Sequence, residues 1–199
     1  MTATLRLAAL ALLLSACSQP AAPPKGSEAP SDPAAPSSPS PEAPAANGRL
    51  SQYTSLKACR VTESNPDEAG YSRSECPGVN GYGLVIVDAD ARQNLLIRAP
   101  GGGEPVSLRL PEQTGGGFSR LGDQAEWRGV SEGGQFRPDA VIVRYGVMEN
   151  GDAAPETSYL LTVSLGQGGP CLAGKTPPGP DQNAAARAAA DTPLRCLAR

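Results

Sequence analysis

The sequence predicts a mainly β fold, an antiparallel sandwich or barrel-like sheet with one short C-terminal helix and two disulfides. Three observations support this prediction. Short runs rich in β-branched and aromatic residues recur at intervals of roughly 8 to 12 residues or more. Glycine-rich turn segments separate these runs. A single stretch near the C-terminus has the alanine-rich composition of a helix.

The strand pattern occurs in seven runs. They are 53–61 (YTSLKACRV), 81–90 (GYGLVIVDAD), 94–100 (NLLIRAP), 105–110 (PVSLRL), 124–130 (QAEWRGV), 140–148 (AVIVRYGVM) and 158–166 (SYLLTVSLG). Trp127 is the sole tryptophan. We expect it in the core, because aromatic side chains stabilise small β domains, although it has the chemistry to stack on a ligand or on Arg128.

The segments between the runs are typical of turns. They are 99–105 (APGGGEP), 114–117 (TGGG), 132–134 (EGG) and 149–156 (ENGDAAPE). Glycine adopts positive φ at low cost, and Asn-Gly favours a tight hairpin. We therefore expect loops here and not phosphate cradles.

The predicted helix spans 181–191 (DQNAAARAAAD), where Asp181 is an N-cap residue followed by strong helix formers. An alanine face buries little area, and burial contributes about 25 cal/mol per Å². We therefore expect this helix to depend on a covalent link for its docking.

Four cysteines follow Cys17: Cys59, Cys76, Cys171 and Cys196. An even number suits an exported chain and allows three connectivities. We favour Cys59 with Cys76 and Cys171 with Cys196, because each pair closes a short local segment; the first would pin ESNPDEAGYSRSE as a loop. The alternative, a four-cysteine zinc site, lacks the C-x-x-C spacing usual for such sites, so no metal is expected.

The first residues, MTATLRLAALALLLSACSQ, have the form of an export signal: one charge at Arg6 and an apolar run of about ten residues, too short to span a bilayer. The LSAC tetrapeptide ending at Cys17 resembles the lipobox of bacterial lipoproteins. That resemblance implies cleavage before Cys17 and its lipidation, and Ser18 in place of Asp favours the outer membrane. The alternative is an ordinary signal peptide with an incidental cysteine.

The chain is thereby divided into three parts. Residues 1–16 are the predicted signal peptide, and 17–48 are the lipidated cysteine and a Pro/Ala/Ser-rich tether that we expect to be disordered. Such a tether is a spacer more often than a recognition site for a proline-binding domain. Residues 49–199 form the predicted single β-rich globular domain.

Charge and composition exclude several functions. The chain has a net charge of −3 and 0 His. The absence of histidine removes Ser-His-Asp triads, Cys-His pairs and H-E-x-x-H zinc sites. The arginines alternate with acidic residues and form no basic stripe, so nucleic acid is not an expected partner.

The stretch GPCLAGKT, Gly169 to Thr176, matches the phosphate-loop pattern G-x-x-x-x-G-K-[ST]. A phosphate loop also needs a helix that begins at the lysine, here Lys175. The following PPGPD breaks any such helix. We interpret the match as coincidental and expect no nucleotide.

Two pairs of carboxylates have a spacing that would suit a catalytic or calcium-binding site. Asp88 and Asp90 would lie on one face of a strand, where they would share a proton or a Ca²⁺ ion, but exposed carboxylates also commonly end a strand at a turn. We interpret Glu149 and Asp152 in the same way: we expect the tip of a hairpin here in preference to a pair of catalytic acids.

The serines offer little. Ser119 and Ser131 are expected in loops without a base, since a Ser-Lys dyad within residues 49–199 would have to use Lys57 or Lys175. The sequence therefore identifies no catalytic residue and no cofactor.

Three segments, CPGVNGYGLVIV (76–87), EWRG (126–129) and RPDAVIVRY (137–145), resemble a group of exported proteobacterial proteins of uncharacterised function. The resemblance covers residues 53–191. It implies one compact domain and assigns no activity or site residue.

Two function classes remain. The first is a binding module, anchored to the membrane by lipid on the periplasmic face of the outer membrane of a Gram-negative bacterium, which captures an envelope protein, a glycan or a small ligand. The second is a hydrolase of envelope glycans, since a carboxylate pair cleaves glycosides without histidine. The hydrolase requires carboxylates in a concave site.

The lipobox predicts that Cys17→Ser leaves the exported chain uncleaved at this site and free of lipid. Metabolic labelling with a fatty-acid probe checks this expectation. Equal labelling of the variant and the wild type would contradict the lipoprotein interpretation.

Overall fold

The computed structural model describes residues 48–149 and 155–198. The predicted signal peptide, Cys17, the tether up to residue 47, and Asp152 lie outside them. Within the described part, no helix is long and apolar enough to cross a membrane. The described elements are β1 (Leu50–Ser55), β2 (Arg60–Asn65), β3 (Tyr71–Cys76), β4 (Gly83–Ala89), β5 (Arg92–Arg98), β6 (Val106–Ser107), α1 (Leu110–Gln113), β7 (Ser119–Glu132), β8 (Gln135–Val147), β9 (Thr157–Ser164), β10 (Cys171–Thr176) and α2 (Gln182–Ala190).

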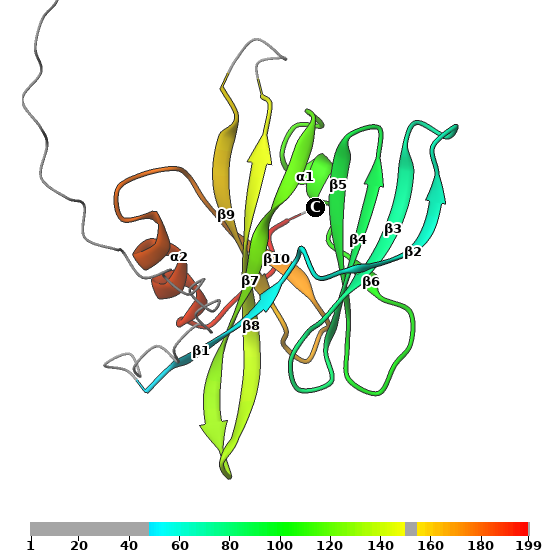
Figure 1. Cartoon of the computed structure of the whole chain (residues 1–199). Coiled ribbons are helices and arrows are strands. Elements are labelled where there is room, and N and C mark those ends of the chain that lie inside the picture. The colour runs from blue at the N-terminus through cyan, green and yellow to red at the C-terminus, as the bar shows by residue number, and fades with distance from the viewer. Residues whose placement is uncertain (1–47, 150–154, 199) are drawn as a thin grey trace, which may run out of the picture. The chain divides into compact units, whose positions relative to one another are not determined.

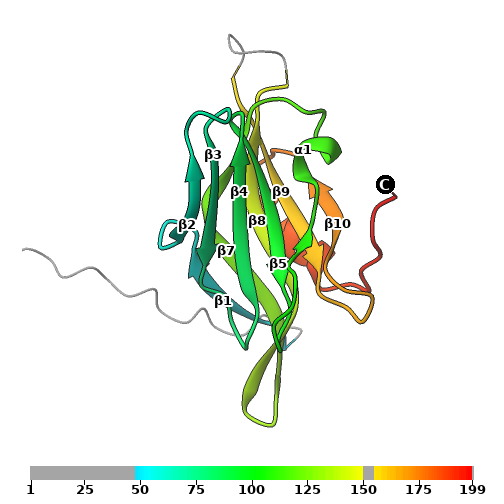
Figure 2. The ribbon, with the colours of Figure 1, turned by 90° about the vertical axis from the view of Figure 1, so that its right-hand side faces the viewer.

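The strands form a sheet in the order β10-β9-β8-β7-β5-β4-β3-β2, with β1 paired to β7 and β6 paired to β5. Its pairs are antiparallel except β5 with β7, which share the parallel bridge Arg92 to Ser119. At this bridge the sheet folds over, so that the β2–β5 half faces the β7–β10 half (Figures 1 and 2). The predicted sandwich-like β fold is confirmed.

The core lies between the two halves of the sheet. It includes Leu84, Leu95, Ile97, Trp127, Val141, Val143, Tyr145, Val147, Leu161 and Val163. Trp127 is fully buried, its Nε1 donates to Thr54 Oγ1 at 2.9 Å, and its ring centroid lies 5.9 Å from that of Tyr82. The predicted core position of Trp127 is confirmed.

Both predicted disulfides are present. Cys59–Cys76 links the chain just before β2 to the end of β3, and Cys171–Cys196 links the start of β10 to the segment after α2. Beside the second bridge, the Leu197 amide donates to the Leu172 carbonyl at 2.8 Å. α2 lies within its predicted range and packs Ala186 and Ala190 against the outer side of the β7–β10 half.

The turn assignment is confirmed for 99–105, 114–117 and 132–134, whereas residues 150–154 of the segment 149–156 lie outside the described residues. Gly133 and Gly134, with φ of +60° and +80°, form a two-residue hairpin between β7 and β8. β7 is longer than the predicted 124–130 at both ends, and β8 extends the predicted 140–148 at its hairpin end, because the tight turn lets the two chains pair up to Glu132 and Gln135.

The segment ESNPDEAGYSRSE is not the predicted loop. Together with its flanks it forms the β2–β3 hairpin, with five residue pairs from Arg60–Glu75 to Asn65–Tyr71. All six residues of β2 are exposed. A strand that buries neither face has no apolar alternation, which is the signal that the sequence prediction used.

The predicted strand 105–110 is also wrong in its second half. β6 ends at Ser107, and Arg109 adopts the left-handed conformation with φ 54° and ψ 43°. α1 then begins, with Pro111 in its first turn. Proline is tolerated there because the backbone N–H that it lacks has no hydrogen-bond partner within the helix at that position. This single turn is a second helix that the sequence did not predict.

The terminal disulfide predicts a local effect. Replacing Cys171 and Cys196 together by Ser should speed amide exchange in α2 and at Leu197, while β7–β9 stay protected, because a bridge over 25 residues contributes roughly 3 kcal/mol to closing this segment. Hydrogen exchange read by mass spectrometry checks the result. Uniform loss of protection across the sheet would contradict a local role.

Candidate functional site

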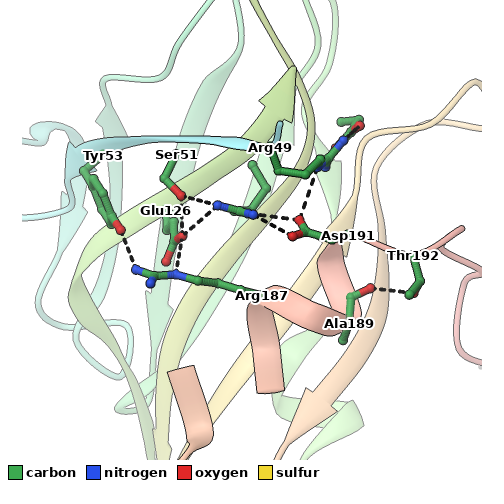
Figure 3. A network of polar contacts seen from close by, with 10 residues as sticks. Arg49, Ser51, Tyr53, Glu126, Arg187, Ala189, Asp191 and Thr192 are labelled. Atoms are coloured by element: carbon green, nitrogen blue, oxygen red, sulfur yellow. Dashed lines mark hydrogen bonds and ion pairs between the residues drawn. The ribbon is translucent and has the colours of Figure 1, made fainter. Parts of the chain in front are cut away.

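A network of ion pairs fastens α2 to the sheet (Figure 3). The Arg128 side chain, 5% exposed, donates from Nε and Nη2 to Asp191 at 3.1 and 2.6 Å. Its Nη1 donates to Ser51 Oγ at 2.6 Å. Asp191 follows directly after α2, so a strand of the sheet holds the C-terminal end of the helix.

Two further arginines extend this network in opposite directions. Arg49 donates to Asp191 at 3.2 Å and makes a second ion pair with Asp139. Arg187 of α2 donates from Nε to Glu126 Oε1 at 2.8 Å and from Nη2 to the Tyr53 hydroxyl at 2.7 Å. β1, β7, β8 and α2 are thereby tied together through alternating charges.

The network adds a second kind of attachment to the covalent link on which we expected α2 to depend. Its three arginines, Arg49, Arg128 and Arg187, face three carboxylates, Glu126, Asp139 and Asp191. A guanidinium buried as deeply as that of Arg128 is tolerated only with charged partners, and removing one partner is strongly destabilising. The helix position is therefore fixed by charge as well as by the covalent bridge.

A groove of about 540 Å³ lies beside the N-terminal half of α2. This volume is in the range of small-ligand sites. Side chains and backbone from β1, β7, β8, β9 and α2 line it: Tyr53, Arg120, Gly122, Asp123, Gln124, Glu126, Ile142, Arg144, Leu160, Asn183 and Arg187. The lining combines an apolar floor with polar and charged walls.

An irregularity in β7 opens the groove. Leu121 pairs with Tyr145 and Ala125 with Val143, so three residues of β7 lie opposite Arg144 alone. A Cβ at Gly122 would lie 2.8 Å from the Cβ of Arg144. Only glycine leaves room there for the arginine side chain, and bulges of this kind commonly redirect a side chain at a site.

Arg144 is held in the groove by neutral acceptors. Its Nη1 donates to Ser158 Oγ and Gln182 Oε1, both at 2.9 Å, and its Nη2 donates to Asn183 Oδ1 at 3.4 Å. Gln182 is itself fixed, since its Nε2 donates to the Ser158 carbonyl at 2.7 Å. The guanidinium is thus positioned without a carboxylate partner among the described residues.

The carboxylates singled out in the sequence lie elsewhere. Asp90 is exposed in the turn after β4 and pairs with Arg92, and Asp88 accepts from Gln93 Nε2 at 3.0 Å. Glu149 is exposed, and the hydrogen bond from the Tyr159 hydroxyl lowers its pKa. That direction is opposite to what a general acid needs.

A second pocket, of about 380 Å³, brings Asp88 near Glu156, and Ser119 also lines it. Glu156 is occupied, because Arg120 donates to both of its oxygens at 2.7 and 3.1 Å. Both oxygens of this carboxylate are therefore engaged by one arginine side chain.

The serines are in β7 and not in the predicted loops. Ser131 is exposed near the hairpin, whereas Ser119 is buried with its Oγ 2.7 Å from the Tyr145 hydroxyl. Burial raises the pKa of Tyr145, so its hydroxyl stays protonated at neutral pH and does not serve as a base. Lys57 forms an ion pair with Asp123.

The phosphate-loop match lies largely in a strand. Residues Cys171 to Thr176 are β10, paired with β9, and Cys171 is in the disulfide. The Lys175 ammonium lies 4.4 Å from the Tyr159 ring centroid, and the next helix begins only at Gln182. In residues 48–149 and 155–198, no group of three or more His, Cys, Asp or Glu is arranged to hold a metal ion.

Comparison with protein-family models, curated proteins and solved structures found no match to this chain. The candidate site therefore rests on the geometry of the groove itself.

The groove predicts a cost for adding one methyl group. Gly122→Ala should lower the free energy of unfolding by about 1–3 kcal/mol, because the new Cβ forces Arg144 or β7 to move. Chemical denaturation measures the change. Gly168→Ala is the control: its Cβ would meet nothing within 4 Å, and we expect a change of about 0.5 kcal/mol or less. Equal stability of Gly122→Ala and the wild type would contradict this account of the bulge.

Proposed function

We propose that this chain is a lipid-anchored protein of the cell envelope whose β-rich domain is a non-enzymatic binding module. The groove beside α2 takes the ligand, which is an envelope protein segment, a glycan or a small molecule. The proposed location is the outer membrane, facing the periplasm.

The observation that carries the proposal is the construction of the groove. Five elements far apart in the sequence contribute to its lining. A glycine at the bulge and a glutamine bonded to two parts of the backbone keep Arg144 in place within it. Binding sites commonly combine such an apolar floor with a few fixed polar groups.

The sequence supports the location. LSAC at the end of the apolar run, the Pro/Ala/Ser-rich tether and the two disulfides all suit an exported lipoprotein. A tether of this composition would hold a binding domain away from the lipid surface.

The hydrolase alternative has one observation in its favour, the shared pocket of Asp88 and Glu156. The contacts favour binding instead. Glu156 is bonded through both oxygens to Arg120, and Asp88 accepts from Gln93. Both carboxylates thus have partners within the protein, whereas glycoside cleavage needs a pair that faces the substrate.

The proposal predicts that blocking the groove abolishes binding. Asn183→Trp places a large side chain on an exposed position of the groove lining, and we expect it to weaken any ligand of the wild type at least about tenfold. The measurement is two-dimensional NMR of the full chain against a library of peptides, glycan fragments and small organic molecules. Wild-type shifts should cluster on residues that line the groove.

The matched control is Ala188→Trp, an exposed α2 position outside the groove lining, which should bind like the wild type. If no library member shifts groove residues, or if both variants lose binding equally, the groove is not the binding site.

A further inference from the structure

The free donors of Arg144 point to a class of ligand. Of its five N–H groups, both on Nη1 are used by Ser158 and Gln182, and one on Nη2 reaches Asn183 at 3.4 Å. The Nε–H and the second Nη2–H have no acceptor among the described residues. Nε and Nη2 form the edge of a guanidinium that binds a carboxylate through two parallel hydrogen bonds, and each of the two keeps a hydrogen without an acceptor in the described part of the chain.

The same chain shows this geometry twice. Arg120 uses Nε and Nη2 to hold the two oxygens of Glu156, and Arg128 uses Nε and Nη2 to hold those of Asp191. Arg144 is the groove arginine whose corresponding edge has no carboxylate in the described structure.

The net charge of the groove also favours an anionic ligand. Of its other charged groups, Arg120 pairs with Glu156, Arg187 with Glu126 and Asp123 with Lys57. These pairs cancel, so the positive charge of Arg144 remains. A cation whose charge is not cancelled by a neighbour attracts an anion to the groove.

The first turn of α2 adds to this field. Asp181 occupies the N-cap position, but its side chain makes no capping hydrogen bond. The amide groups that begin the helix are therefore not satisfied by that carboxylate, and Asn183 in this turn lines the groove. The positive end of the helix dipole favours a negative group there.

We propose that the groove binds a ligand through a carboxylate, with Arg144 as the anchor and Ile142 and Leu160 in contact with the apolar part of the ligand. This inference rests on the proposed function and narrows it. The carboxylate belongs either to a small organic acid or to the end of a peptide chain, and in both cases it accepts hydrogen bonds from the Arg144 guanidinium.

The test uses matched acids and amides with the full chain. Benzoate and benzamide probe the small-acid source, and N-acetyl-dialanine and its C-terminal amide probe the peptide source. We follow the titrations by NMR, including the side-chain Nε–H signal of Arg144. An acid that binds in the groove should bind at least about tenfold more tightly than its amide. The pair with the tighter acid identifies the source.

Two variants and a control examine the anchor. Arg144→Gln should lose the preference for acid over amide, and Arg144→Lys should retain part of it, because lysine keeps the charge without the fork. Arg73→Gln is the control, since Arg73 also has no salt bridge in the described structure but lies on β3, outside the groove lining. We expect it to bind like the wild type, and a folded spectrum of each variant excludes unfolding as the cause.

The outcomes separate the two proposals. Equal binding of acids and amides in the groove, blocked by Asn183→Trp, overturns the carboxylate inference and leaves the binding function standing. Acid binding that survives Arg144→Gln unchanged, or no acid binding at millimolar concentration, also overturns it. Absence of any groove ligand from the wider library overturns the binding function itself.

Discussion

The two faces of β7 organise the rest of the molecule. Its residues alternate, so Ala125 and Trp127 enter the core between the sheet halves, whereas Glu126 and Arg128 contact the residues around α2. The same strand hydrogen-bonds to β8 along one edge and to β1 and β5 along the other. One strand therefore supplies side chains both to the apolar core and to the polar contacts with α2. A shift of β7 by a single residue would turn the core side chains toward α2 and the polar ones into the core.

The ion pairs also give α2 a definite position. Alanine methyl groups present nearly the same surface at every turn, so Ala186 and Ala190 alone would fix neither the rotation nor the axial position of the helix. Hydrogen bonds from guanidinium groups are directional and do fix both. The groove depends on this placement, because Asn183 and Arg187 reach its lining from α2.

The sequence predicted those features of the fold that depend on residues close together in the chain. Most strands that bury one face, the described glycine turns, the core tryptophan and the sequence-local cysteine pairs were found in this way, whereas β10 was not among the predicted runs. The β2–β3 hairpin was not, because its exposed strand has no apolar alternation. The site was also missed: Arg144 and Gln182 are 38 positions apart, and Arg128 and Asp191 are 63 apart. The available signal was an arginine inside the apolar run 140–148, which marks a charge that the fold must accommodate.

The position of Arg49 has a mechanical consequence. It is the residue before β1, so any tension along the preceding chain reaches the fold through it. Its guanidinium bonds to Asp139 of β8 and to Asp191 after α2. A pulling force is therefore shared among a strand, a helix end and β1 before the hydrogen bonds between β1 and β7 bear it alone. The Arg49 ion pairs would thus carry part of such a load at the point where the preceding chain enters the domain.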